Sequence, residues 1–228
     1  LKAGLVVVNT NPLYTPREME HQFNDSGAKG ILILANFASN LQKILKNTSI
    51  NVIITTEIGD MLGSLKGGLV NFVVKRIKKM VPSYSLDNEI KYKDALKQGK
   101  KFKLNTDHKS GPEDVIVLQY TGGTTGVSKG AMLTNKNLIA NMMQIKAFIT
   151  PYLNEGDDQI ILAPLPLYHI FAFTVNCLAA MDLGALSVLV ANPKELKTVI
   201  KEFDRYKITG MTGVNTLYNA LLNNEDFR

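Results

Sequence analysis

The stretch Leu-Gln-Tyr-Thr-Gly-Gly-Thr-Thr-Gly-Val-Ser-Lys-Gly-Ala-Met-Leu-Thr, residues 118–134, continues the apolar run of residues 115–118. Glycine lets backbone N–H groups turn toward an anion because no Cβ intervenes, hydroxyls donate further hydrogen bonds, and lysine adds a mobile positive charge. This combination after a buried strand predicts a polyphosphate-binding loop. Residues 121–129 form this glycine-threonine loop. The candidate phosphate-binding residues are Tyr120, Thr121, Gly122, Gly123, Thr124, Thr125, Gly126, Val127, Ser128, Lys129 and Gly130.

A Walker A loop also binds phosphates, but it requires Gly-x-x-x-x-Gly-Lys-Ser/Thr running directly into a helix. Here residues 127–128 separate the preceding glycine from Lys129. The next helix signal comes late, because Thr134 is a suitable N-cap for a helix over residues 135–148, and residues 130–133 are expected to be extended. The spacing therefore argues against a P-loop NTPase. A plain solvent loop is the other alternative, but such loops seldom combine these residues after a buried strand.

The sequence Tyr-Thr-Gly-Gly-Thr-Thr-Gly-Val-Ser-Lys-Gly at residues 120–130 resembles the signature of the acyl-adenylate-forming superfamily of acyl-CoA synthetases, luciferases and peptide-synthetase adenylation domains. Three further segments extend the resemblance. They are Val-Asn-Thr-Asn-Pro-Leu-Tyr at 8–14, Pro-Leu-Pro-Leu-Tyr-His at 164–169, and Thr-Gly-Val-Asn-Thr-Leu-Tyr-Asn-Ala-Leu-Leu at 212–222. Together they closely resemble bacterial long-chain fatty acyl-CoA synthetases, over essentially the whole chain.

The resemblance implies ATP-dependent activation of a long-chain fatty acid, first to an acyl adenylate with release of pyrophosphate, then to acyl-CoA with release of AMP. It implies that the glycine-threonine loop holds the β- and γ-phosphates, that Mg²⁺ arrives with ATP, and that coenzyme A is the co-substrate. By the same resemblance, His169 lies beside the reacting carboxylate, and Gly213 and Val214 line the acyl pocket. Gly122 stands where the superfamily commonly has Ser or Thr, so one hydroxyl is missing.

The resemblance also implies that this chain is a fragment of a larger N-terminal domain. The family's aromatic-Gly-x-Thr-Glu segment, its Thr-Gly-Asp segment and the lysine of its mobile C-terminal domain do not occur before Arg228. We therefore expect a long-chain fatty acid:CoA ligase as the parent enzyme and an inactive isolated fragment. Two alternatives stay open: an acyl-activating ligase for a smaller carboxylic acid, and a membrane-binding module in which the loop is unused.

Alternating strand and helix signals predict an α/β fold of mainly parallel sheets with helices on both faces. Two subregions are expected, residues 1–110 and residues 111–228, the second carrying the glycine-threonine loop. Both would be parts of one incomplete adenylation domain. Short apolar runs predict strands at residues 5–8, 31–35, 52–56, 115–121, 160–163, 187–191 and 208–212.

Two further helix starts are marked by capping residues. Thr15 is a suitable N-cap, with Pro16 as the first helical residue and Glu18 in the capping-box position, and Gly27 is a suitable stop. The dipeptide Asn-Pro at 192–193, with a glutamate at residue 195, marks a second start.

Residues 75–103 concentrate the positive charge, with ten Lys/Arg against three Asp/Glu in a chain of net charge +6. On a helix over residues 69–81, apolar side chains share one face and lysines the other. The helix is interpreted either as docked on the protein's own core, or as lying on an anionic membrane surface. Nucleic-acid binding is not expected because no recognised motif accompanies the charge. The candidate membrane-surface residues are Phe72, Lys75, Arg76, Lys78 and Lys79.

The composition of the 228-residue chain, 45% hydrophobic, fits a soluble globular protein. It contains no apolar run of about 18 residues and no signal-peptide pattern. The single cysteine, Cys177, excludes an intramolecular disulfide, which suits the reducing cytoplasm. If the basic helix contacts a membrane, we expect that contact on the cytoplasmic face. The three histidines and one cysteine show no metal-ligand spacing, so no protein-held metal site is expected.

Overall fold

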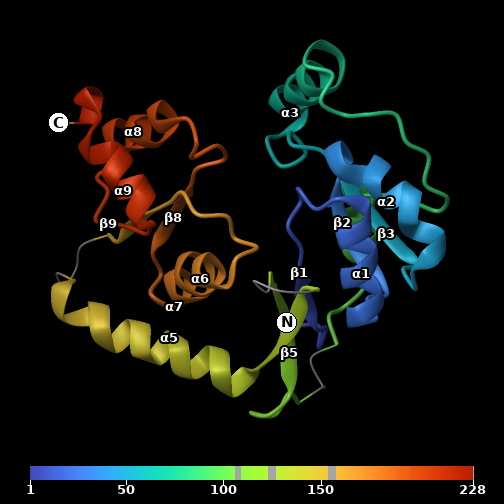
Figure 1. Cartoon of the computed structure of the whole chain (residues 1–228), viewed down its shortest axis with the longest axis horizontal. Coiled ribbons are helices and arrows are strands. Elements are labelled where there is room, and N and C mark those ends of the chain that lie inside the picture. Colours follow the sequence, from blue (N-terminus) through green and yellow to red (C-terminus); the bar gives the residue numbers. More distant parts are fainter. Residues whose placement is uncertain (106–108, 123–126, 154–157, 228) are drawn as a thin grey trace. The chain divides into compact units, whose positions relative to one another are not determined.

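The computed structural model describes residues 1–105, 109–122, 127–153 and 158–227, and Figure 1 shows its elements. The chain divides into two compact units. Unit 1 comprises residues 1–110 and 116–132, and unit 2 comprises residues 111–115 and 133–228. Most of the strand that precedes the glycine-threonine loop thus groups with unit 1, because it pairs with a strand near the start of the chain. The subregion boundary expected at residue 110 stays a prediction.

The strands of the described residues form three three-stranded sheets, in the orders β1-β5-β6, β2-β3-β4 and β8-β7-β9. Strand β5 is parallel to β1, β3 is parallel to both β2 and β4, and β7 is parallel to both β8 and β9. The α/β class with parallel sheets is therefore confirmed. The strands are β1 (Val7–Asn9), β2 (Gly30–Leu34), β3 (Val52–Thr56), β4 (Ile90–Lys91), β5 (Val115–Thr121), β6 (Lys129–Thr134), β7 (Ile160–Ala163), β8 (Leu186–Leu189) and β9 (Gly210–Met211).

The seven strands expected from the sequence are confirmed, with ends that shift by up to two residues. Two strands were not expected as such. Strand β4 is only two residues long, too short for a pattern, and β6 covers the residues expected to be extended. One face of β2 packs into the core through Ile33, whereas Leu32 on the other face is 59% exposed. Within the described residues, helices therefore cover this sheet incompletely on its second face.

The α-helices are α1 (Pro16–Ser26), α2 (Ala38–Ile44), α3 (Ser64–Phe72), α4 (Tyr92–Gly99), α5 (Asn135–Ile149), α6 (Ile170–Ala172), α7 (Ala180–Asp182), α8 (Leu196–Arg205) and α9 (Asn215–Leu222). Short 3₁₀ turns occur at η1 (Ala35–Phe37), η2 (Leu45–Asn47), η4 (Thr150–Tyr152) and η6 (Glu225–Phe227). Two segments, η3 (Val73–Ile77) and η5 (Phe173–Ala179), are π-helical.

The predicted limits of α1 are confirmed by its cap geometry. The Thr15 side chain accepts a hydrogen bond from the Glu18 N–H, and the Glu18 carboxylate accepts one from the Thr15 N–H at 2.8 Å. Gly27 ends the helix in the left-handed region, with φ of 63°, where a residue without a Cβ is favoured. The predicted cap of α5 is also confirmed, because Thr134 forms a capping box with Asn137.

Helix α8 begins later than the sequence indicated. The Asn192 side chain donates a hydrogen bond to the Glu195 carboxylate at 2.6 Å, and the Glu195 N–H donates to the Asn192 carbonyl. These bonds close a turn over residues 192–195, so Glu195 becomes the N-cap and Leu196 the first helical residue. The expectation of a helix starting at Pro193 was wrong because the same residue types favour a turn as well as a cap.

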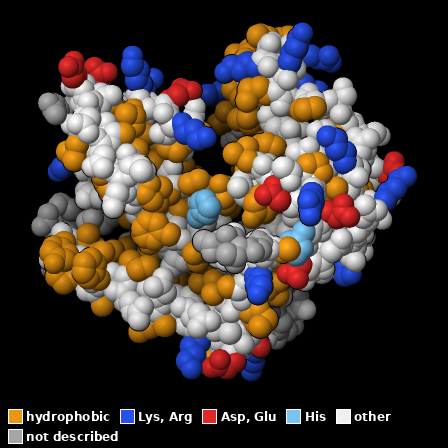
Figure 2. All heavy atoms as spheres, viewed as in Figure 1, with side chains coloured by type: hydrophobic (Ala, Val, Ile, Leu, Met, Phe, Trp, Pro, Cys, Tyr) orange, Lys and Arg blue, Asp and Glu red, His pale blue; other side chains and the backbone are white. Residues whose placement is uncertain are grey.

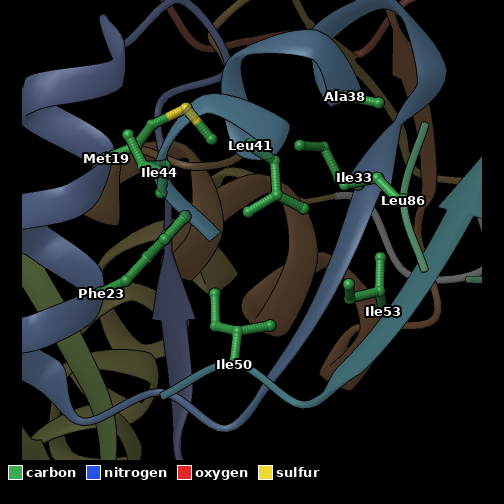
Figure 3. Packing of buried hydrophobic residues seen from close by; sticks show 9 residues of the cluster. All are labelled: Met19, Phe23, Ile33, Ala38, Leu41, Ile44, Ile50, Ile53 and Leu86. Carbon is green, nitrogen blue, oxygen red and sulfur yellow. The ribbon is translucent and has the colours of Figure 1, made fainter. Parts of the chain in front are cut away.

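Each unit has its own apolar cluster. In unit 1, Leu41 and Ala38 of α2 are 0% exposed, and Figure 3 shows how they meet side chains from α1 and the neighbouring strands. The members are Met19, Phe23, Ile33, Ala38, Leu41, Ile44, Ile50, Ile53 and Leu86. In unit 2 the cluster is smaller and consists of Leu162, Val188, Val199 and Leu221. The unit 2 cluster includes Leu162 of β7, the strand whose carboxyl end precedes the segment that leads to His169.

Candidate functional site

The glycine-threonine loop leaves the carboxyl end of β5 in unit 1. Thr121 and Gly122 are exposed at its start, and Val127 and Lys129 are exposed at its end. The hydroxyl of Ser128 donates a hydrogen bond to the Thr121 carbonyl at 2.9 Å, which brings the two ends of the loop together. Among the candidate residues, Gly123, Thr124, Thr125 and Gly126 lie outside the described residues.

Tyr120 is the last buried residue before the loop, and its side chain is held in place by burial and by a hydrogen bond. Its side chain is 7% exposed, and its hydroxyl donates a hydrogen bond to the Asp25 carboxylate of α1 at 2.5 Å. Burial raises the pKa of the Tyr120 phenol, and the bond to Asp25 raises it further, so the phenol stays protonated at neutral pH. A Cβ at Gly130 would lie 2.9 Å from the Tyr120 ring, which explains a glycine at the opposite side of the loop.

His21 makes a second long-range contact with the loop. Its Nε2 atom lies 2.8 Å from the Ser128 carbonyl oxygen. A carbonyl only accepts hydrogen bonds, so Nε2 carries the hydrogen in this contact. The sequence offered no reason to select His21, because its partner lies 107 positions away. The predictions missed both His21 and Asp25 for this reason.

The three candidate substrate-site residues, His169, Gly213 and Val214, belong to unit 2. Strands β7 and β9 are parallel neighbours, with Leu162 in register with Met211. The segment that leads to His169 follows the carboxyl end of β7, and Gly213 and Val214 follow that of β9. Carboxyl ends of parallel strands are the usual location of ligand residues in α/β proteins. The two segments that carry the three predicted residues thus leave the same edge of this sheet.

His169 is exposed and forms the N-cap position of α6. Its ring lies against the Tyr168 ring, with 4.3 Å between the centroids. The helix that follows changes at once to the π-helical η5, a feature that often accompanies functional sites. An exposed imidazole on a helix terminus can donate a hydrogen bond from its N–H to a bound anion.

The turn at Gly213 and Val214 is held from both sides. The Asn176 amide, which is 2% exposed, donates to the Thr212 hydroxyl at 2.8 Å and accepts from it at 3.0 Å. The Tyr218 hydroxyl donates to the Met211 carbonyl at 3.1 Å. A Cβ on Gly213 would lie 2.9 Å from the Tyr218 ring, so only glycine fits without displacing that ring.

The basic helix has different limits from those expected. It comprises α3 and the π-helical η3 and ends at Ile77, so the expected continuation to residue 81 was wrong. Lys79 has a positive φ of 50°, a backbone conformation that ends a right-handed helix. Lys78 and Lys79 therefore follow the helix, whereas Phe72, Lys75 and Arg76 lie on it.

Helix α3 docks through its small and polar residues. Gly67 is buried against Gly59, and the Asn71 side chain accepts a hydrogen bond from the Gly59 N–H at 2.7 Å. The large apolar side chains of the α3–η3 segment are exposed instead. Their exposed fractions are 90% for Leu65, 65% for Leu69, 57% for Phe72 and 64% for Ile77.

No group of three or more His, Cys, Asp or Glu side chains that could hold a metal ion occurs in the described ranges. No helix among these residues is long and apolar enough to cross a bilayer.

The parallel sheets and the alternation of strands with helices define an α/β protein with candidate site residues at the carboxyl ends of strands. A family model described as "AMP-binding enzyme" matches residues 1–228, so the chain belongs to the AMP-binding enzyme family.

Known relatives extend well beyond this chain. A long-chain-fatty-acid–CoA ligase of Salmonella typhimurium is 51% identical over 228 residues, covering 100% of this chain and 40% of that protein. The solved long-chain-fatty-acid-CoA ligase of Archaeoglobus fulgidus is 26% identical, with a TM-score of 0.61, over 95% of this chain and 36% of its own. ATP-bound MatB from Rhodopseudomonas palustris has a TM-score of 0.64 at 20% identity, over 99% and 37% of the two chains, a likeness of fold alone.

Proposed function

We propose that the chain is part of a long-chain fatty acid:CoA ligase that forms AMP. The observation that carries the proposal is the 51% identity to a ligase of this name along the whole chain. The chain spans about two fifths of that relative, so the complete reaction is proposed for a protein of the relative's length. A ligase for a smaller acid would share the same loop and is the alternative that the substrate test below distinguishes.

The proposed chemistry begins with a poor electrophile, the fatty acid carboxylate. Its oxygen attacks the α-phosphorus of ATP, the bond to pyrophosphate breaks, and an acyl adenylate forms. The thiol of coenzyme A then attacks the acyl carbon, loses its proton, and expels AMP. A protein assists such steps mainly by positioning and by electrostatic stabilisation of the charge that develops on the leaving group.

The described residues have separate parts in this proposal. The exposed Lys129 and Thr121 flank the loop and would bind the β- and γ-phosphates, one as a cation and the other as a hydroxyl donor. His169, exposed beside Tyr168, would lie next to the reacting carboxylate. The turn of Gly213 and Val214 would form part of the acyl pocket wall. Gly213 has no side chain to fill the space, and the hydrogen bond between Asn176 and Thr212 holds the preceding residue in place.

Magnesium would enter as MgATP. The described residues offer hydroxyl oxygens at the loop and no carboxylate cluster, a set that suits an ion already coordinated by phosphate oxygens and water. When bound, the ion would neutralise charge on the phosphates. Lys129 and the backbone N–H groups of the loop would orient the same phosphates independently of it.

Calorimetric titration with MgATP tests the loop. Binding by the chain is expected to be lost or weakened at least about tenfold in Lys129→Ala, because a charged hydrogen bond to phosphate disappears. Lys201→Ala removes the same charge from an exposed site on α8 and serves as the matched control. Equal affinity for all three proteins would refute the phosphate assignment.

The substrate class is tested in a protein of the relatives' length that contains this chain. Pyrophosphate release should rise with acyl chain length from acetate to palmitate. A preference for acetate or an aromatic acid would instead support the ligase for a smaller acid.

We propose, second, that the α3–η3 segment contacts an anionic membrane surface. The specific observation is the exposure of Leu65, Leu69, Phe72 and Ile77 beside basic residues. Figure 2 shows hydrophobic and basic side chains gathered over the region where Figure 1 places α3. Docking through Gly67 leaves the apolar residues outward, which disfavours the alternative of an apolar face packed on the protein's own core.

Flotation with vesicles tests this contact. Binding to phosphatidylglycerol vesicles at low salt, with loss at high salt, is expected because lysines near an anionic surface contribute through screened attraction. Phe72→Ser should weaken binding, whereas Phe148→Ser removes an exposed phenylalanine of α5 and is the control. Absence of binding at low salt would refute the contact.

A further inference from the structure

Helix α1 presents two different faces within unit 1. Met19 and Phe23, each 3% exposed, belong to the apolar cluster of this unit, and Figure 3 shows them extending from α1 toward that cluster. His21, Gln22 and Asp25 lie on another side: His21 and Asp25, at positions i and i+4, are neighbours on the helix surface, and Gln22 lies between them and the apolar face. The apolar side of α1 thus packs on the core of unit 1, and its polar side is available for contacts with another segment of the unit.

Three hydrogen bonds run from this second face to the sheet β1-β5-β6 and its loop. They join His21 Nε2 to the Ser128 carbonyl at 2.8 Å, Gln22 Nε2 to the Asn9 carbonyl at 3.0 Å, and the Tyr120 hydroxyl to the Asp25 carboxylate at 2.5 Å. Gln22 is 1% exposed, so its bond to β1 is buried.

The two outer bonds reach opposite ends of the same loop. Tyr120 directly precedes the glycine-threonine loop, and Ser128 is its penultimate residue. The bond from the Ser128 hydroxyl to the Thr121 carbonyl closes the loop between these two points. Both ends are therefore tied to one another and to a single rigid helix.

We propose that α1 is the positioning element of the glycine-threonine loop, with His21 and Asp25 holding its two ends in the geometry that binds the phosphates of ATP. The inference rests on the proposed phosphate-binding function of the loop. Neither residue contacts the nucleotide. His21 acts through the Ser128 backbone, next to Lys129, and Asp25 acts through Tyr120.

The physical effect is preorganisation. A loop whose ends are free loses conformational entropy when it closes around a ligand, and that loss opposes binding. The two described ends of the loop have already lost part of this freedom in folding, so Thr121 and Lys129 extend from positioned backbone before the ligand arrives. Loss of one anchor is expected to weaken MgATP binding about tenfold, the typical effect of one net hydrogen bond.

The surroundings of His21 and Asp25 leave room for substitutions. His21 and Asp25 border an open hollow of about 680 Å³ on the surface of unit 1, so a changed side chain has space without disturbing the core. His21→Phe keeps a planar ring and removes the donor. His21→Gln keeps an N–H donor at a similar reach. Asn24→Ala changes an exposed neighbour on the same helix and is the control.

The experiment combines MgATP titration with hydrogen exchange of the backbone amides of residues 121–130 in the nucleotide-free chain. His21→Phe should weaken binding about tenfold and speed exchange in the loop by a similar factor. His21→Gln should restore most of both effects, and Asn24→Ala should change neither. Rescue by the glutamine distinguishes a hydrogen-bonded anchor from general packing.

Each outcome decides the proposal. Unchanged exchange in His21→Phe would overturn it, whether or not binding weakens, because the loop would then not depend on this anchor. If the unsubstituted chain fails to bind MgATP, the proposed phosphate site is refuted for this chain. In that case, faster exchange in His21→Phe would still show that α1 positions the loop. Unchanged exchange would refute the positioning role of α1 together with the phosphate site.

Discussion

Two adjacent glycines in α3 should respond oppositely to the same substitution. An ideal Cβ on Gly67 would lie 2.2 Å from the Gly59 carbonyl oxygen, whereas a Cβ on Gly68 would have no heavy atom within 4 Å. The added Cβ is bonded directly to the backbone and the Gly59 carbonyl oxygen belongs to the backbone, so no side-chain rotation can relieve the overlap. Gly67→Ala must therefore displace α3 from the turn at Gly59, and Gly68→Ala leaves it in place.

The magnitudes follow from two opposing terms. Alanine in place of a helix-interior glycine stabilises the helix by about 1 kcal/mol, and this gain is common to both variants. Overpacking at Gly67 costs about 1–3 kcal/mol or more, because the methyl group cannot be accommodated by a rotamer change. The difference between the two variants thus measures the overlap alone. We expect Gly68→Ala to stabilise α3 and Gly67→Ala to destabilise it.

Hydrogen exchange of the amides in residues 64–77 is the appropriate assay, because it reports the local opening of one segment in a chain of two units. Exchange should slow about fivefold in Gly68→Ala, and should be about 5- to 150-fold faster in Gly67→Ala than in Gly68→Ala, the factors that correspond to about 1–3 kcal/mol. Far-UV circular dichroism of both variants checks that the remaining helices are retained. Equal slowing in the two variants would refute the close packing of α3 on Gly59.

Three further substitutions or conditions have defined outcomes. Leu162→Ala should lower the free energy of unfolding of unit 2, measured in urea, by about 2–5 kcal/mol, since Leu162 is 0% exposed. A loss below about 1 kcal/mol would contradict the burial of Leu162 in the apolar cluster of unit 2. Thr212→Val leaves the buried Asn176 amide without this partner and should cost about 1–3 kcal/mol in the same assay, so a neutral result would argue against the pair. Hydrogen bonds to the Thr15 side chain and backbone hold the pKa of Glu18 below its ordinary value of 4.5. The capping box therefore stabilises α1 above that pH and is lost as the pH falls through the lowered pKa; NMR of the Thr15 amide should follow this change, and a midpoint at or above the ordinary value would refute it.

Local signals predicted much of the fold. The strands over residues 52–56, 115–121 and 160–163 have the expected limits because each is an apolar run between turn residues. The caps at Thr15 and Thr134 also lie where expected, since a capping box depends only on residues three positions apart. Where local chemistry allowed two structures, as in residues 192–195, the sequence could not choose between a turn and a helix start.

The candidate site divides in the same way. Glycines, hydroxyls and a lysine after an apolar strand identify the glycine-threonine loop, and a resemblance over short motifs selects His169, Gly213 and Val214. Nothing local selects Asp25, because its role depends on a tyrosine 95 positions away. The outward orientation of the apolar side of α3 was equally hidden, since it depends on which small residue docks against Gly59.

The sequence by itself determined the alternation of strands and helices, the ends of α1 and the position of the loop after β5, because these depend on neighbours within a few positions. Only the tertiary structure decided that α1 joins the loop through His21 and Asp25, that Asn176 holds the turn before Gly213, and that α3 exposes its apolar side chains. These contacts join residues far apart in the chain. Their formation depends on the folding of the whole unit, which fixes distant backbone segments within hydrogen-bonding reach.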